Sequence, residues 1–493
     1  MKKVFVLCLV ACFAGALSAQ RIQFQQGDKS NKRVTTKPQL VHILEGLQDN
    51  QLFVVEPLFN PAKKTRAIKV RLCNMEWEDE KDVKIDDTKN YNIETAFRNG
   101  NTLHLLLSFD DRDFIKLRHV ALDVQSFALV ADEFVVNHEY TAAQNGVVWA
   151  ATSPDGTKHC AVLRLWSDNG GNYAAGAQAF LFDNDMKLLW KKDLKSPEIH
   201  QVIVTDGGEV VTSAMGYVED NENEAIVLFN LADANGATAA KLSTHADLNK
   251  MTLLNYRDGK VLLTALEGEG SPYRRAGLRQ YSGFYACCYD ISVGKMVAEQ
   301  HYRFTPDDIR IFENADNDDR VDATTNSLNV LDNCATLQGG AVLVNKNWKY
   351  EMRGKNHDDR VYNVGMLLFQ IDMDGKITRS PIRQSNCNFD WPPVGTDIFP
   401  YNDKLYIVTN ESDNETDKYD PEKPAIAPFT MFKTNTALAI YTVTPEGQVS
   451  KQMLEKERKA YLGSRLFKGK DNKFYFLSGP TLYPTKISCV TIP

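Results

Sequence analysis

The sequence has 493 residues, 43% of them hydrophobic and 25% charged, and a mean hydropathy of −0.36. A chain of this composition can bury a sizeable core, which excludes a fully disordered protein. The formal net charge is −7 and no basic stripe is present, so we expect no nucleic-acid partner.

The first 19 residues have the layout of a secretory signal peptide. Lys2 and Lys3 form a charged start, and the apolar run at 4–16 is too short to span a bilayer as a stable helix. Cleavage after Ala19 leaves Gln20 as the first residue. The sequence therefore predicts export, with the periplasm, the outer membrane or the extracellular space as the destination.

A second processing route stays open at the same end. Residues 9–12 match a lipobox, whose cysteine, here Cys12, is lipidated after cleavage. Apolar residues follow Cys12 instead of a polar tether. We therefore expect contact with a membrane only if Cys12 is lipidated.

Downstream of the signal the chain repeats one hairpin unit eight times: an apolar segment, a tight polar turn and an alternating apolar strand. Asn-Gly, Asp-Gly and Gly-Gly pairs at the turns permit the positive φ that two-residue hairpins need. The equivalent turn residues are Asn50, Gly100, Gly156, Gly208, Gly259, Gly340, Asp403 and Asn472.

A second hairpin unit lies between successive copies of the first. Its turn often ends in Gly-Lys or Gly-Gln, as in Asp290-Ile-Ser-Val-Gly-Lys and Asp372-Met-Asp-Gly-Lys, and a strand lies on each side of it. Two hairpins per period give four strands per period, and four-stranded sheets repeated radially are propeller blades. The sequence therefore predicts an all-β fold, a single β-propeller of four-stranded antiparallel blades over residues 41–493. Eight blades are favoured, and seven is the alternative.

The two ends of the chain suggest how the ring closes. The last copy contributes 464–469, 473–478 and 486–492, and it then lacks one strand. The segment 20–40 begins with Arg21-Ile-Gln-Phe-Gln, which can supply the missing outer strand. Closure removes the exposed sheet faces at the two ends of an open stack.

The turn pattern Asp-x-x-x-Gly-Lys resembles the repeat of quinoprotein-dehydrogenase-like propellers, which are typically eight-bladed. Ser153-Pro-Asp-Gly-Thr is similar to the turn of WD40-like propellers. The tryptophan that follows Gly-Lys in the quinoprotein family is matched only loosely, at Trp190. The resemblance implies a β-propeller fold over most of the mature chain. It does not extend to a quinone site, so we expect no cofactor.

Seven cysteines remain after the signal, an odd number, and none lies in a C-x-x-C spacing. We expect scattered buried thiols. A single bridge between Cys334 and Cys387 is the alternative.

In such a blade, the turns between strands one and two and between strands three and four share one face, and the other connections share the opposite face. Nearly all length variation falls in the second class, where binding residues usually lie. Arginine and aromatic residues gather in the long segments 268–283, 347–363 and 386–396 and suit planar anionic, glycan or protein ligands. The candidate binding residues are Tyr273, Arg274, Arg275, Arg279, Trp348, Tyr350, Arg353, His357, Arg360 and Trp391. The alternative is that these are solvated loops without a ligand.

One acidic run offers a candidate metal site, at Asp316, Asp318 and Asp322. A calcium loop requires glycine at its sixth position and glutamate at its twelfth, where Val321 and Ser327 stand. We therefore expect no metal site.

Catalytic motifs are missing from the sequence: it has no G-x-S-x-G elbow, no phosphate-binding loop and no complete zinc-protease motif. We therefore expect a monomeric, non-catalytic binding or scaffold propeller that presents a loop-rich face to an envelope protein or glycan. The alternative is a secreted enzyme that acts on polysaccharide or peptide at the mouth of the propeller channel. A third hypothesis, an accessory of outer-membrane protein assembly, requires lipidation or capture by membrane proteins.

Overall fold

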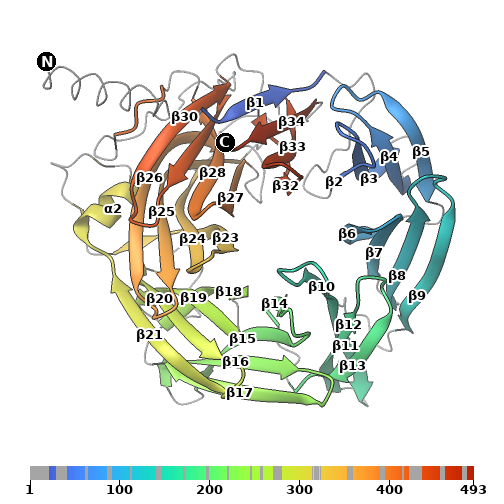
Figure 1. Cartoon of the computed structure of the whole chain (residues 1–493). Coiled ribbons are helices and arrows are strands. Elements are labelled where there is room, and N and C mark those ends of the chain that lie inside the picture. Colours follow the sequence, from blue (N-terminus) through green and yellow to red (C-terminus); the bar gives the residue numbers. More distant parts are fainter. Residues whose placement is uncertain are drawn as a thin grey trace, which may run out of the picture.

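Eight antiparallel sheets follow one another around a central opening in the computed structural model of this protein (Figure 1). The structure describes residues 21–28, 41–60, 65–85, 91–110, 114–139, 147–169, 172–195, 199–218, 221–244, 247–255, 259–269, 280–313, 315, 321–322, 324–351, 359–388, 395–412, 416–420, 436–455, 461–479 and 486–493. The fold is an eight-bladed β-propeller, so the prediction of an all-β ring with eight blades is confirmed.

Within blades 1 to 7 the four main strands run in sequence order from the channel to the rim, and in blade 8 the outer strand comes from the start of the chain. Blades 1 and 2 consist of β2 (His42–Glu45), β3 (Leu52–Asn60), β4 (Thr65–Cys73) and β5 (Asp79–Ile85), and of β6 (Asn92–Asn99), β7 (Thr102–Asp110), β8 (Phe114–Asp123) and β9 (Leu129–Glu139). Blades 3 and 4 consist of β10 (Val147–Thr152), β11 (His159–Asn169), β12 (Asn172–Phe182) and β13 (Leu188–Asp193), and of β14 (Gln201–Val204), β15 (Val210–Val218), β16 (Asn221–Ala232) and β17 (Ala237–Thr244).

The second half of the ring follows the same order. Blades 5 and 6 consist of β18 (Asp247–Asn255), β19 (Lys260–Glu269), β20 (Gln280–Asp290) and β21 (Lys295–Arg303), with β22 (Thr325–Asn326) added to β20, and of β23 (Leu328–Ala335), β24 (Gly339–Glu351), β25 (Asp359–Asp372) and β26 (Ile377–Asn388). Blades 7 and 8 consist of β27 (Thr396–Tyr401), β28 (Lys404–Ser412), β29 (Thr436–Val443) and β30 (Val449–Glu455), and of β31 (Tyr461–Leu462), β32 (Phe467–Lys468), β33 (Lys473–Gly479), β34 (Lys486–Thr491) and β1 (Gln23–Gln26).

The turns between the first and second strands have the backbone conformation that the repeat predicted. Asn50, Gly100, Gly156, Gly208, Gly259, Asp403 and Asn472 all have positive φ. In blade 6 the residue with φ of 156° is Gly339, one position before the predicted Gly340. Asparagine and aspartate tolerate this left-handed region better than other non-glycine residues, which explains their use here.

An aspartate where the third strand ends caps the turn between the third and fourth strands. In blade 6, Oδ1 of Asp372 accepts the backbone N–H groups of Asp374 at 3.0 Å and of Lys376 at 2.8 Å. In blade 3, Oδ1 of Asp183 accepts those of Asp185 at 3.0 Å and Lys187 at 2.9 Å. The aspartate thus stabilises the turn locally, because its carboxylate accepts backbone N–H groups that no neighbouring strand pairs.

The ring closes as predicted from the two chain ends. β1 pairs antiparallel with β34, from Gln23 opposite Thr491 to Gln26 opposite Ser488, and so becomes the outer strand of blade 8. Outside this ladder, Gln452 of blade 7 binds both the N–H and the carbonyl of Ile22, at 3.1 and 2.8 Å.

The hydrophobic core is divided among the eight interfaces between blades. Eight clusters of buried side chains each bridge two neighbouring blades, among them one that joins blade 8 to blade 1. Phe284 of blade 5 and Phe369 of blade 6, for example, stack with ring centroids 4.2 Å apart. Both faces of each sheet are therefore buried, which explains why the strands carry apolar residues on both sides.

One short helix, α2 (Pro306–Phe312), interrupts the strand pattern between blades 5 and 6 (Figure 1). Thr305 and Asp308 form a capping box at its start, and Ile309, Ile311 and Phe312 are buried in the core between these blades. Among the described residues, no helix is long and apolar enough to cross a membrane.

The cysteine positions favour free thiols. Cys73, Cys160, Cys287, Cys288, Cys334 and Cys489 are all free. Cys334 lies on the first strand of blade 6, whereas Cys387 lies on its fourth. Neighbouring strands are about 4.8 Å apart, so strands one and four are separated by far more than the roughly 7 Å limit for bridged Cα atoms. The alternative of a Cys334–Cys387 bridge is therefore wrong.

Candidate functional site

The two faces of the propeller differ in the length of their connections. We call the face that holds the turns between strands one and two and between strands three and four the turn face, and the opposite one the loop face. On the loop face, β11 is followed by β12 after only two residues, whereas β19 ends at Glu269 and β20 begins at Gln280. In blade 7, β28 ends at Ser412 and β29 begins at Thr436. The long connections thus gather over blades 5 to 7, the elaborated sector.

All ten candidate binding residues belong to this sector. Tyr273, Arg274, Arg275 and Arg279 lie in the connection 270–279, Arg353 and His357 in 352–358, and Trp391 in 389–394, and these residues lie outside the part of the chain that the structure describes. Trp348 and Tyr350 belong to β24, and Arg360 belongs to β25.

The segment 347–363, predicted as a loop, is mostly a hairpin. β24 continues to Glu351 and β25 starts at Asp359, with Trp348 opposite Tyr362 and Tyr350 opposite Arg360. Likewise β26 extends to Asn388, inside the predicted loop 386–396. Pairing satisfies the backbone polar groups of a long excursion, which a loop of the same length would leave to water. The hairpin therefore places Tyr350 and Arg360 at opposite register positions at the end of blade 6.

For the candidate metal site, Asp316 and Asp318 lie outside the described residues, and Asp322 is exposed. Within the described ranges, no group of three or more His, Cys, Asp or Glu side chains is arranged to hold a metal ion.

Polar side chains on four of the channel-lining strands tie a blade to the next one. Oδ2 of Asp332 in β23 accepts the N–H of Ile398 in β27 at 3.0 Å, and Asp397 in β27 accepts the N–H of Leu466 in blade 8. Gln201 in β14 accepts the N–H of Leu253 in β18 in the same way. His42 of blade 1 adds a hydrogen bond to the backbone of Ile93 in blade 2. These first-strand side chains act as ring ties, because their partners belong to the following blade.

Asp332 and Asp397 are also bonded to each other. Burial raises the pKa of Asp397 well above its usual value, and the charge and hydrogen bond of Asp332 raise it further. The raised pKa favours the protonated form of Asp397, whose O–H can donate to Asp332. The positive charge of Arg465, which is exposed on the innermost segment of blade 8, lowers the pKa of Asp397 but by less than these causes raise it. Directly bonded carboxyls are closer than the about 5 Å or more that separates glycosidase carboxylates, so their geometry fits a tie better than a hydrolytic pair.

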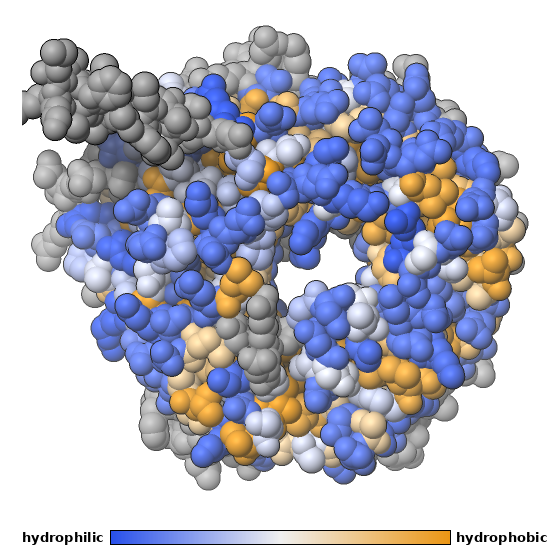
Figure 2. Space-filling view, in the orientation of Figure 1, coloured by the Kyte–Doolittle hydropathy of each residue, from blue (hydrophilic) through white to orange (hydrophobic). Residues whose placement is uncertain are grey.

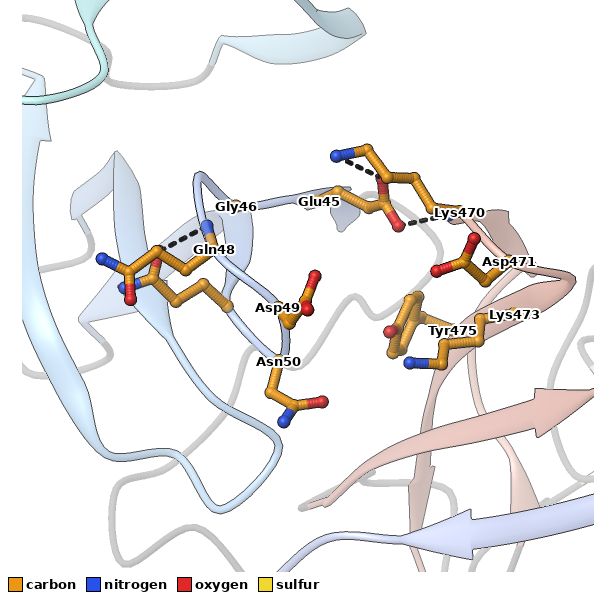
Figure 3. Close-up of a pocket in the computed structure, with 10 residues that line it drawn as sticks. Glu45, Gly46, Gln48, Asp49, Asn50, Lys470, Asp471, Lys473 and Tyr475 are labelled. Carbon is orange, nitrogen blue, oxygen red and sulfur yellow. Dashed lines mark hydrogen bonds and ion pairs between the residues drawn. The ribbon is translucent and has the colours of Figure 1, made fainter.

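A shallow polar cleft lies on the turn face at the seam between blades 1 and 8 (Figure 3). Glu45 accepts the N–H of Lys470, and the carboxylate lies 3.9 Å from Lys470 Nζ. Tyr475 faces the cleft, and burial followed by nearby Cys489 and the acids raises its pKa. The residues of this cleft therefore hold blade 1 to blade 8, the two blades between which the ring closes.

The central channel is open in Figure 2, and hydrophilic residues border most of its rim in that view. Sequence reasoning missed the ring ties, although Asp332 and Asp397 each stand in the strand before an inner turn. The signal in the sequence was an aspartate at a similar level in two successive first strands.

No family model matches the sequence, and no curated protein matches it. Among solved structures the chain is similar to the Dos1 propeller, with 9% identity and a TM-score of 0.45 over 95% of each chain. It is also similar to the WD40 domain of SCAP from fission yeast, with 9% identity and a TM-score of 0.40 over 97% of this chain and 96% of that one. A Synechocystis apocarotenoid oxygenase matches with 10% identity and a TM-score of 0.35 over 90% and 95% of the two chains. At these identities the likeness concerns the fold, and it says nothing of activity.

Proposed function

We propose that this chain is exported and acts as a non-catalytic binding or scaffold propeller, whose loop face receives a protein or glycan partner in the cell envelope. The propeller fold itself supports a binding or scaffold role. The observation that carries the proposal is the concentration of long connections over blades 5 to 7, while the turn face keeps short, self-satisfied turns. Unequal elaboration of one face is typical of a rigid scaffold that displays binding loops.

The residues of the elaborated sector suit such a partner. Arginine offers a planar fork for carboxylate or sulfate groups, and it stacks on aromatic rings. Tyrosine and tryptophan contribute large rigid contact areas to glycan and protein interfaces. The β24–β25 hairpin supports this proposal, because its register places Tyr350 opposite Arg360 on paired strands at the end of blade 6.

The second candidate function, hydrolysis of polysaccharide or peptide at the channel mouth, has one observation in its favour. Asp397 stands at the start of β27, next to a loop-face connection, and carries a raised pKa as a general acid would. The hydrogen bonds of Asp397 to Leu466 and Asp332 favour a structural role as a ring tie over a catalytic role as a general acid. Loss of hydrolysis of an envelope glycan or peptide by Asp397→Asn, with folding intact, would favour the enzyme.

The binding proposal is tested with the full mature chain and two loop variants. Replacement of 270–279 and of 352–358 by short Gly-Ser linkers leaves β19, β20, β24 and β25 intact. A matched control carries substitutions of Ser126 and Asp374, which are exposed on turn-face turns. We expect the loop variants to lose an envelope protein or glycan that wild type and control retain. Unchanged binding by the loop variants contradicts the proposal.

Export is tested separately, by mass spectrometry of the mature chain from cell fractions. We expect a first residue of Gln20 and an unchanged product in a Cys12→Ser variant. A lipid-modified Cys12 at the mature N-terminus would instead place the propeller on a membrane. An unprocessed chain in the cytoplasm contradicts export.

A further inference from the structure

A chain of hydrogen bonds crosses blade 2 from its rim to its buried interior. Nδ1 of His119 in β8 lies 3.3 Å from Oε1 of Glu133 in β9. Nε2 of His119 lies 3.1 Å from Nδ1 of His104 in β7. The rings of His104 and His119 are only 4% and 3% exposed, so water does not substitute for these partners.

These contacts determine where the protons are. A carboxylate accepts, so Nδ1 of a neutral His119 carries the proton, and its Nε2 is a lone pair. That lone pair must accept from His104 Nδ1–H, which leaves Nε2 of His104 without a proton. Nε2 of His104 is buried and has no hydrogen-bond partner within the described part of the chain. The arrangement is therefore complete only while both imidazoles are neutral.

The same rings join blade 2 to blade 3. Phe97 of β6 stacks on His104 with centroids 5.1 Å apart, and on His159 of β11 with centroids 3.6 Å apart. His159 is 1% exposed, and it contacts Thr152 Oγ1 at 3.1 Å and Asn184 Oδ1 at 3.3 Å. An imidazole–phenyl–imidazole stack therefore spans the interface between the two blades.

We propose that this stack is a proton-operated joint, which holds blades 2 and 3 together while its imidazoles are neutral and loosens when they are protonated. A proton added to His104 Nε2 creates a donor with no acceptor in a buried site. A proton added to His119 has the same result, because His119 Nε2–H then donates to His104 Nδ1 and the His104 proton must move to Nε2. In either case a buried charge is created beside a second imidazole.

Charged groups surround the joint on both blades. They are Glu133, Asp132 and Arg118 of blade 2, Asp183 and Asp185 in the turn between β12 and β13, and Asp155 and Lys158 in the turn between β10 and β11. Burial is the first cause of the lowered pKa of all three imidazoles, and it brings that of His104 to about 4, with His119 adding to the effect. The negative charges of Asp185 and Asp183 raise the pKa of His104, but by less than burial lowers it.

The direction of the pH effect follows from these pKa values. Between the ordinary value of 6.5 and about 4, the unfolded or opened chain binds more protons than the closed joint. Stability of the joint is therefore complete above 6.5 and is lost as pH falls towards 4. Each histidine can raise the opening equilibrium constant by at most about tenfold per pH unit in this window.

The test uses hydrogen exchange and equilibrium unfolding of the full mature chain from pH 7 to pH 4. After correction for intrinsic rates, we expect exchange to rise in β6, β7, β10 and β11 at pH 4.5 before it rises at the interface between blades 5 and 6. His104→Phe keeps the stack on Phe97, and it should flatten the added pH dependence. His200→Phe, at an exposed histidine, should leave it unchanged. Equal pH slopes in wild type and His104→Phe, or uniform exchange in all blades, overturn the proposal. Should the variant not fold, NMR titration of wild-type His104 decides: a pKa near 4 supports the joint, and one near 6.5 overturns it.

Discussion

Asp332 in β23 accepts the backbone N–H of Ile398 in β27 at 3.0 Å, so that a side chain of one blade completes the first strand of the next. Asp397 repeats the arrangement one blade later, with Leu466. Such ties link neighbouring blades, whereas the hydrogen-bond ladders hold together the strands within one blade. They give the acidic residues of the channel wall a structural role.

The raised pKa of Asp397 predicts how stability depends on pH. Because the folded pKa of Asp397 is raised, the folded state binds more protons above about pH 4, and stability falls as pH rises through the folded pKa. Asp397→Asn keeps an acceptor for Leu466 and removes the titration. We expect the variant to equal wild type at pH 4 and to exceed it at pH 8, with a slope difference of at most ~1.4 kcal/mol per pH unit. Chemical denaturation at several pH values measures this, and Asp322→Asn, at an exposed acid, is the control. Identical slopes for Asp397→Asn and wild type would refute the raised pKa of Asp397.

Closure by β1 predicts that one aromatic residue near the N-terminus stabilises the whole ring. Phe24 is partly buried and packs on Phe476 with centroids 6.4 Å apart. We expect Phe24→Ala to lower the free energy of unfolding by about 2 kcal/mol, less than is typical of a fully buried phenylalanine. The outward-pointing Gln25→Ala on the same strand should cost much less. If both variants unfold at the wild-type denaturant concentration, β1 does not close the ring in solution.

The contact between α2 and blade 6 depends on a glycine. A Cβ atom at Gly365 would overlap the carbonyl oxygen of Ile311. We expect Gly365→Ala to destabilise the protein by about 1–3 kcal/mol, because the helix or the strand must shift. Gly176 is the control, since an added Cβ there meets no atom within 4 Å and its φ is ordinary. Thermal unfolding of the two variants compares them. An unchanged midpoint for Gly365→Ala would mean that α2 does not sit on β25 as described.

Buried and exposed ion pairs should respond differently to loss of the cation. Arg71 and Glu56 form a pair with side chains 7% and 1% exposed. Arg71→Met leaves the carboxylate buried without this partner, and we expect a loss of about 3–5 kcal/mol. The double variant Arg71→Met, Glu56→Leu should recover most of that loss. Arg310→Met removes the partner of Asp307, which is 70% exposed, and should cost under about 1 kcal/mol. Equal effects of the two single variants would contradict the burial of the Arg71 pair.

The parts of the fold that the sequence could predict are local. Asn50 and Gly100 indicate turns between first and second strands, because both residue types tolerate positive φ. Asp372 indicates a turn between third and fourth strands, because its carboxylate accepts backbone N–H groups of the turn. The missing strand of the last blade likewise pointed to a segment near Phe24, because each blade needs four strands. Period and turn chemistry therefore sufficed for the architecture.

The parts that the sequence could not predict depend on contacts between distant residues. Asp332 meets Ile398 across 66 positions, and that distance follows from the angle between two blades, not from any motif. The contact between His104 and His119 depends on the register of β7 and β8. That register places Leu106 opposite His119, so that His104, two residues before Leu106 on the same face of the sheet, is the diagonal neighbour of His119. Tyr350 and Arg360 were predicted as loop residues because polarity hid the alternation of a paired hairpin.

The most direct test of the account is to find which face of the propeller touches the partner. A photo-crosslinking amino acid is placed at Arg275 in the connection 270–279 or at Lys355 in the connection 352–358, and at Ser126 or Asp374 on the turn face, in the mature chain. Each variant is exposed to intact envelope material under light. We predict one specific adduct, protein or glycan, from the loop-face positions and none from the turn-face positions. Adducts that form mainly from Ser126 or Asp374 would contradict the account.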